Sequence, residues 1–149
     1  MIVASRDLAL FRGEVTMVDG SFDPLHEGHI EYFRLASELG YPVLCNIAPD
    51  TWTATKHRIL LAQHQRATII DAIRYISYVH VAEGSTAEVL QTLVPAVYAK
   101  GRDWLDRGGV PALESELCQS LGIRVSYLDS VENSSSEILR SFDSGETKK

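Results

Sequence analysis

Residues 20–29 read GSFDPLHEGH and separate two different hydrophobic patterns. The residues before them, 15–18, read VTMV, an apolar run rich in β-branched side chains that predicts a buried strand. Apolar side chains then recur with helical spacing over residues 30–39, and Gly40 ends that pattern. The decapeptide is therefore predicted to be a tight turn that joins a strand to the first turn of a helix.

A turn of this kind is where an α/β protein binds phosphate. The N–H groups at the start of a helix lack intrahelical partners, and the helix dipole makes that end positive. Gly20 and Gly28 allow the backbone to come close to a ligand. His26 and His29 are three residues apart, so they share one face of the helical turn. Two ring donors beside an anion site suit a triphosphate.

The decapeptide resembles the signature of the nucleotidylyltransferase superfamily, the cytidylyltransferase-like enzymes. Their pattern is Gly-x-Phe-Asp followed by His-x-Gly-His. Every position of it is present here, as Gly20, Phe22, Asp23, His26, Gly28 and His29. The resemblance implies that these turn residues, together with Ser21, bind the nucleotide phosphates, except that Asp23 is expected to bond its own turn backbone. The alternative is a polar turn with two surface histidines.

Strand-like runs alternate with helical patterns through the rest of the chain. Strands are predicted at residues 42–48, 78–81, 97–99 and 123–128, helices at residues 6–12, 62–76, 85–93 and 111–121, and loops at residues 49–58 and 100–110. This alternation predicts a Rossmann-like three-layer α/β sandwich, with a five-stranded parallel sheet covered by helices on both faces. Ligand is then expected at the carboxyl ends of the strands.

Basic side chains after the second predicted strand are candidates for contact with the triphosphate. The resemblance places a phosphate-binding lysine here, and Lys56 fills that position, with His57 and Arg58 as near substitutes. Arg58 is also a candidate for the second substrate, and a solvated basic loop is the alternative. Arg66 follows Gln65 where family members often carry an arginine, and a surface helix arginine is the alternative.

Residues 100–104, KGRDW, resemble two stretches of the family. One is Lys-Gly-Gly-Asp-Tyr of the heptose 1-phosphate adenylyltransferases, and the other is Gly-Asp-Asp-Trp of the glycerol-3-phosphate cytidylyltransferases. The resemblance implies that Lys100, Gly101 and Asp103 bind the nucleotide. Arg102 departs from both patterns and is a candidate for the phosphate of the second substrate. A structural turn is the alternative.

Residues 134–140, SSSEILR, resemble the C-terminal motif of the family, Ser-(Ser/Thr)-Thr-x-Ile with a basic residue nearby. The resemblance implies that Ser134, Ser135, Ser136 and Arg140 bind the nucleotide. Ser134 and Glu137 also form a capping box for a last short helix, so the capping and binding roles can coexist.

The composition excludes several classes of protein. A chain of 149 residues suits one domain, and a formal net charge of −6 argues against a general nucleic-acid binder, which needs a basic face. No apolar run approaches the roughly 18 residues of a membrane span, and the first residues lack the layout of a secretory signal. Cys45 and Cys118 stand in apolar contexts at unrelated spacings, which predicts buried free thiols in a reducing cytoplasm.

The resemblance implies a nucleotidylyltransferase domain over residues 1–142, a frayed tail over residues 143–149, and a homodimer. Catalysis is expected to rest on positioning and charge neutralisation by His26, His29, Lys56 and Arg66 with Mg²⁺, without a side-chain nucleophile. ATP and a sugar phosphate such as heptose 1-phosphate are the preferred substrates, and pyrophosphate is released. CTP with glycerol-3-phosphate or a related alcohol phosphate is the alternative. A non-catalytic nucleotide-binding paralogue and a flavodoxin-like electron-transfer protein are the alternatives from other classes.

Overall fold

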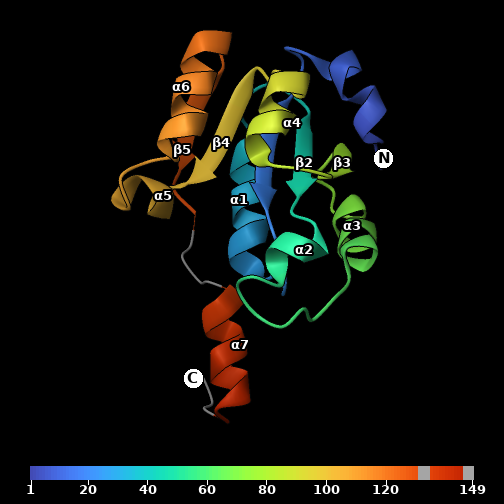
Figure 1. Cartoon of the computed structure of the whole chain (residues 1–149), viewed down its shortest axis with the longest axis vertical. Coiled ribbons are helices and arrows are strands. Elements are labelled where there is room, and N and C mark those ends of the chain that lie inside the picture. Colours follow the sequence, from blue (N-terminus) through green and yellow to red (C-terminus); the bar gives the residue numbers. More distant parts are fainter. Residues whose placement is uncertain (131–134, 146–149) are drawn as a thin grey trace.

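The computed structural model describes residues 1–130 and 135–145. Five parallel strands form a sheet in the order β3-β2-β1-β4-β5 (Figure 1). The strands are β1 (Thr16–Gly20), β2 (Val43–Ile47), β3 (Tyr78–Val81), β4 (Val97–Gly101) and β5 (Arg124–Leu128). The predicted Rossmann-like α/β fold is confirmed.

Helices cover both faces of this sheet. The helices of the described chain are η1 (Ser5–Phe11), α1 (Glu27–Ser37), α2 (Asp50–Thr53), α3 (Gln63–Asp71), α4 (Thr86–Leu93), α5 (Arg102–Asp106), α6 (Ala112–Leu121) and α7 (Ser135–Asp143), and five of them cover the sheet. Helices α1 and α3 pack on one face through a core that includes Val18 and Ile70. The other face carries η1, α4 and α6 through a core that includes Met17 and Leu90. Adjacent residues such as Met17 and Val18 point to opposite faces, as the two-residue period of a strand requires.

The order of the strands places a reversal between β1 and β4. These two strands are neighbours, although the chain passes through β2 and β3 between them. In open α/β sheets, ligands bind outside the carboxyl ends of the strands at such a reversal. Residues 20–29 leave the carboxyl end of β1, residues 48–62 leave that of β2 and residues 102–107 follow β4. Figure 1 shows α2 just beyond the end of β2.

Three segments differ from their prediction. Residues 49–58, predicted to be a loop, contain α2, whose single turn is too short to show an apolar period. Lys100 and Gly101 extend β4 into the second predicted loop, and the short helix α5 occupies its next five residues. Helix α3 ends at Asp71 rather than at residue 76, and Ile73 and Ile76 pack on the α1 face from the turn that follows. Helical spacing of the isoleucines therefore continued past the end of the helix.

Cys45 and Cys118 are buried free thiols, as predicted. Among the described residues, no helix is long and apolar enough to cross a membrane. The predicted tail over residues 143–149 lies outside the described part of the chain from position 146, and Ser134 lies outside it too. Figure 1 shows α7 beyond the carboxyl ends of the strands.

Candidate active site

Two imidazole rings cap the start of α1. His26 is the N-cap residue, and its Nδ1 accepts a hydrogen bond from the N–H of Gly28 at 3.1 Å. The Nδ1 of His29 accepts the N–H of His26 at 3.2 Å, and the two rings stack with their centroids 3.8 Å apart. The motif histidines therefore hold each other and the helix start in one arrangement.

These hydrogen bonds set the proton positions on both rings. Because each Nδ1 accepts a backbone N–H, the proton of the neutral ring is on Nε2. Burial, followed by the neighbouring His26, lowers the pKa of His29 to about 3. At physiological pH His29 is therefore a neutral N–H donor rather than a cation.

Phe22 holds the His29 ring in place. The two rings meet edge to face with centroids 4.9 Å apart, and Phe22 also meets Phe33 of the core at 5.2 Å. The φ of Phe22 is 54°, a left-handed conformation that costs a non-glycine residue about 1–3 kcal/mol. A Cβ on Gly20 would stand 3.0 Å from the Phe22 ring, so Gly20 makes room for this side chain as well as shaping the predicted phosphate turn.

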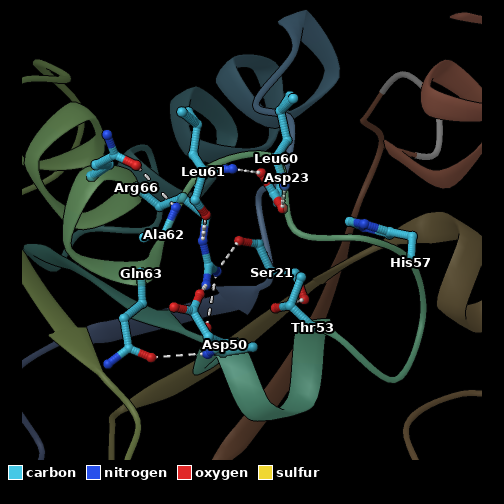
Figure 2. A network of polar contacts seen from close by, with 12 residues as sticks. Ser21, Asp23, Asp50, Thr53, His57, Leu60, Leu61, Ala62, Gln63 and Arg66 are labelled. Atoms are coloured by element: carbon cyan, nitrogen blue, oxygen red, sulfur yellow. Dashed lines mark hydrogen bonds and ion pairs between the residues drawn. The ribbon is translucent and has the colours of Figure 1, made fainter.

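Asp23 joins this turn to the loop that precedes α3. Its carboxylate is fully buried, and its two oxygens accept the N–H of Leu60 at 2.8 Å and the N–H of Leu61 at 2.9 Å (Figure 2). Asp23 was predicted to bond the backbone of its own turn. That prediction is wrong, because its partners lie in the loop before α3. The two loops meet at the carboxyl ends of β1 and β2, so the carboxylate crosses between them.

Arg66 lies beneath the same turn and is 1% exposed. Its guanidinium donates to the carbonyl oxygens of Ser21 at 2.7 Å, Ala48 at 2.9 Å and Leu61 at 3.0 Å. It also pairs with the Asp50 carboxylate at 2.6 Å (Figure 2). One side chain thus connects the segments that follow β1 and β2 with the start of α3. Its donors point into the protein, which suits a residue that positions the phosphate turn.

The Ser21 hydroxyl is held from the side of α2. Thr53 is fully buried, and its Oγ1 donates to the Ser21 Oγ at 3.1 Å. Together with Arg66 on the Ser21 carbonyl, this contact fixes both the backbone and the side chain of the residue after Gly20. Thr53 was not among the predicted site residues, because its segment lacks a helical period that would have marked it.

Comparison with known proteins supports the motif. The family model described as Cytidylyltransferase-like matches residues 17–140. The chain belongs to the cytidylyltransferase-like family. The bifunctional protein HldE of Pelobacter propionicus is 32% identical over 125 residues, which are 81% of this chain and 25% of that protein. HldE of Geobacter metallireducens is 29% identical over 138 residues, which are 87% of this chain and 28% of that protein. The chain spans about a quarter of the length of these curated relatives.

Solved structures share the fold of this family member. The lipopolysaccharide core biosynthesis protein of Thermoplasma volcanium superposes with a TM-score of 0.66 at 20% identity, covering 80% of this chain and 98% of that one. Pantothenate synthetase of Thermus thermophilus superposes with a TM-score of 0.60 at 16% identity, covering 92% of this chain and 66% of that one. At these identities the similarity shows the fold alone.

Lys100 of the middle motif is buried in this cytidylyltransferase-like chain. Its ammonium lies 2.7 Å from the Asp19 carboxylate and 4.2 Å from the centroid of the Trp104 ring. Asp19 also accepts the Tyr98 hydroxyl at 3.0 Å and the Thr86 hydroxyl at 3.3 Å. Lys100 was predicted from its motif, whereas Asp19 was not predicted. A carboxylate at the end of an apolar strand, next to Gly20, was the available signal.

Tyr98 connects this pair to a second carboxylate. Its hydroxyl lies 3.0 Å from Asp19 Oδ2 and also 3.0 Å from Glu114 Oε1. A tyrosine has one hydroxyl hydrogen and cannot donate to both. Burial, together with the charge of Asp19, raises the pKa of Glu114. The Tyr98 hydroxyl therefore donates to Asp19 or to Glu114, and these two partly buried carboxylates share its single hydrogen.

The remaining predicted cations lie at the surface. Lys56 and Arg58 are exposed, and the Lys56 ammonium is 5.4 Å from the centroid of the Trp52 ring. Arg102 is exposed and pairs with Asp129 at 2.5 Å. Lys56 therefore stands on the loop between α2 and α3, whereas Arg102 stands beyond β4 in an existing ion pair.

The other residues predicted to bind the nucleotide lie at the end of β4 and just after it, or in the C-terminal motif, residues 134–140. Asp103 pairs with Arg107 at 2.6 Å, and a Cβ on Gly101 would stand 2.6 Å from the Asp103 carboxylate, so a larger residue there would displace that carboxylate. Arg140 is exposed on α7. Ser134 lies outside the described residues, and so do the side chains of Ser135 and Ser136.

Proposed function

We propose that this protein transfers a nucleoside monophosphate from an NTP, with ATP preferred, to a sugar phosphate such as heptose 1-phosphate, releasing pyrophosphate. The observation that carries the proposal is the pair of stacked, mutually capped histidines at the start of α1. Their fixed Nε2–H donors and the positive end of the helix suit a triphosphate. Membership of the cytidylyltransferase-like family supports the same reaction class.

The acceptor phosphate supplies the nucleophile. The second pKa of a phosphate monoester is about 6, so this group is largely ionised near neutral pH. Its oxygen attacks the α-phosphorus of the NTP in line, and that O–P bond forms as the bond to the pyrophosphate oxygen breaks. No proton has to be removed. A histidine with a pKa of about 3 suits such a site, because it donates a hydrogen bond and is not required as a base.

Transition-state stabilisation then depends on donors that are held in place. Negative charge grows on the departing pyrophosphate, and preorganised N–H groups bind that charge without first having to reorient. His26 and His29 supply two such donors, and Lys56 supplies a positive charge from the exposed loop beyond α2. Arg66 acts as a positioning residue, because it holds the Ser21 carbonyl beneath the turn.

Mg²⁺ is the cofactor that this reaction class implies. Among the described residues, no group of three or more His, Cys, Asp or Glu side chains is placed to hold a metal ion. The Asp19 carboxylate at the reversal is already paired with Lys100. This arrangement fits an ion that is held mainly by phosphate oxygens and water, as is common for Mg²⁺. Bound in that way, the ion would neutralise charge on the phosphates.

CTP with glycerol-3-phosphate or a related alcohol phosphate is the second candidate pair. Residues 101–104, Gly-Arg-Asp-Trp, favour it, because they resemble the Gly-Asp-Asp-Trp stretch of the glycerol-3-phosphate cytidylyltransferases. The Lys100-Gly101 pair favours the first candidate, because it resembles the heptose 1-phosphate enzymes. A homodimer and binding of the nucleotide by Lys100, Gly101, Asp103, Ser134, Ser135, Ser136 and Arg140 are parts of the same proposal.

A screen for pyrophosphate release tests the proposal. ATP, CTP, GTP and UTP are each combined with Mg²⁺ and a panel of sugar phosphates and alcohol phosphates. We expect release with one nucleotide only when its acceptor is present. His29→Asn is the matched variant, because the amide oxygen can replace Nδ1 as an acceptor while the Nε2 donor is lost. Turnover should fall by about 100-fold or more. NTP binding without any release would favour a non-catalytic nucleotide-binding protein.

A further inference from the structure

A second cluster of reactive side chains lies away from the phosphate turn, at the edge of the sheet formed by β3. The Ser5 Oγ lies 2.7 Å from Nε2 of His80, and Nδ1 of His80 lies 2.8 Å from Oδ1 of Asn46. A hydroxyl, an imidazole and an amide oxygen thus follow one another at hydrogen-bond distance. Serine nucleophiles, their bases and the groups that orient those bases have the same order in acyl-transfer enzymes.

The fold brings these three residues together from separate segments. Asn46 on β2 pairs in register with His80 on β3, so both side chains point to the same face of the sheet. Helix η1 covers that face, and Ser5 is its first residue. The N–H of Val3 donates to the carbonyl of Val79 at 2.7 Å, which ties the segment before Ser5 to β3. Ser5 is therefore held near His80 by the backbone pairing of the segment that precedes it.

The surroundings favour the tautomer in which His80 is a base. His80 is 1% exposed and Asn46 is 3% exposed, and burial lowers the pKa of His80, so the ring is neutral near pH 7. When Nδ1–H donates to the Asn46 oxygen, Nε2 keeps its lone pair and accepts the hydroxyl proton of Ser5. Ser5 itself is only partly buried, which leaves its hydroxyl within reach of a small reagent.

We propose that Ser5 is an activated serine, and that it is a site of covalent modification by acyl or organophosphoryl compounds that carry a good leaving group. The Ser5 Oγ attacks the carbonyl carbon or the phosphorus, and its proton passes to Nε2 of His80. The bond from Oγ to that centre forms, the bond to the leaving group breaks, and the leaving group departs as an anion. Asn46 is the positioning residue that holds the ring with Nε2 toward Ser5.

An alkyl fluorophosphonate tests this directly. In its reaction the Oγ–P bond forms, the P–F bond breaks and fluoride leaves. The whole protein is incubated with the reagent near neutral pH, and labelling of each serine is followed by peptide mass spectrometry. Ser120 is the internal control, because it is exposed and its hydroxyl donates to the backbone carbonyl of Leu117 at 3.4 Å rather than to an imidazole. We expect Ser5 to react at least about 100 times faster than Ser120, the gain typical of a positioned base.

Four variants assign the roles. Ser5→Ala should lose the fast label, and Ser120→Ala should keep it. Asn46→Asp can only accept a hydrogen bond, so it enforces the same tautomer and should keep or raise the rate. His80→Gln should reduce labelling of Ser5 to the Ser120 rate, with a melting curve to show that the variant is folded. Wild-type Ser5 that labels no faster than Ser120 would overturn the proposal, whatever the variants show. The three side chains would then only anchor η1 to the sheet.

Discussion

Replacement of Arg66 by lysine tests whether one buried guanidinium holds the phosphate turn together. Arg66 donates to the carbonyl oxygens of Ser21, Ala48 and Leu61, which belong to three different segments. Lysine keeps the charge, but its ammonium is a point donor and cannot reach all three carbonyls as the planar guanidinium does. At least two buried acceptors lose a donor, and each loss costs about 1–3 kcal/mol. Arg66→Lys should therefore lower the free energy of unfolding by at least about 2 kcal/mol.

Urea unfolding followed by circular dichroism measures this loss. The melting temperature should fall by at least about 4 °C, given the size of the chain. Arg74→Lys is the matched control, because Arg74 is exposed and donates to the Tyr75 hydroxyl at 2.9 Å. It should stay within about 0.5 kcal/mol of the parent protein. Arg66→Lys with the same small effect would refute the positioning role.

Three further substitutions test other parts of the site. Asp23→Asn leaves one oxygen for the two N–H groups of Leu60 and Leu61, so urea unfolding should show a loss of about 1–3 kcal/mol. Because the folded-state pKa of His29 is about 3, the unfolded chain binds a proton that the folded chain does not as pH falls from 6.5. In urea titrations between pH 6.5 and 3, the free energy of unfolding of the parent protein should fall by up to about 5 kcal/mol more than that of His29→Asn. Equal losses in the two proteins would contradict the lowered pKa of His29. Glu114 has the opposite effect on the pH dependence of stability, because its pKa is raised in the folded chain and the unfolded chain therefore ionises first as pH rises above 4.5. Glu114→Gln should gain stability relative to the parent as pH rises. A difference in the free energy of unfolding that stays constant with pH would count against the raised pKa of Glu114.

The sequence predicted most of the architecture because its signals are local. The run before Gly20, the spacing after it and the capping box of Ser85 with Glu88 each depend on residues that are close in the chain, and the structure contains all three features. Where a pattern outlasted its element, the prediction failed. Ile73 and Ile76 continue a helical spacing but pack from the turn after α3, because tertiary contacts place them there.

The polar contacts around the site could not be predicted in the same way. Asp23 reaches Leu60, and Arg66 reaches Ser21, across loops whose meeting depends on the order of the strands. Lys100 was predicted from a local motif, but its burial against Asp19 follows from the pairing of β4 with β1. Hydrogen bonds between distant loops leave no periodic trace in a single sequence. Motif resemblance could therefore identify candidate residues without showing which of them face the ligand and which support it.

Transfer of an isotopic label tests the central claim most directly. The protein is incubated with Mg²⁺, the acceptor found in the pyrophosphate screen, and NTP labelled either at the α-phosphorus or at the γ-phosphorus. If the acceptor phosphate attacks the α-phosphorus, the α label appears in the acceptor product and the γ label appears in pyrophosphate. Transfer of the γ label to the acceptor, or release of both labels without a nucleotidyl product, would contradict nucleotidyl transfer by this site.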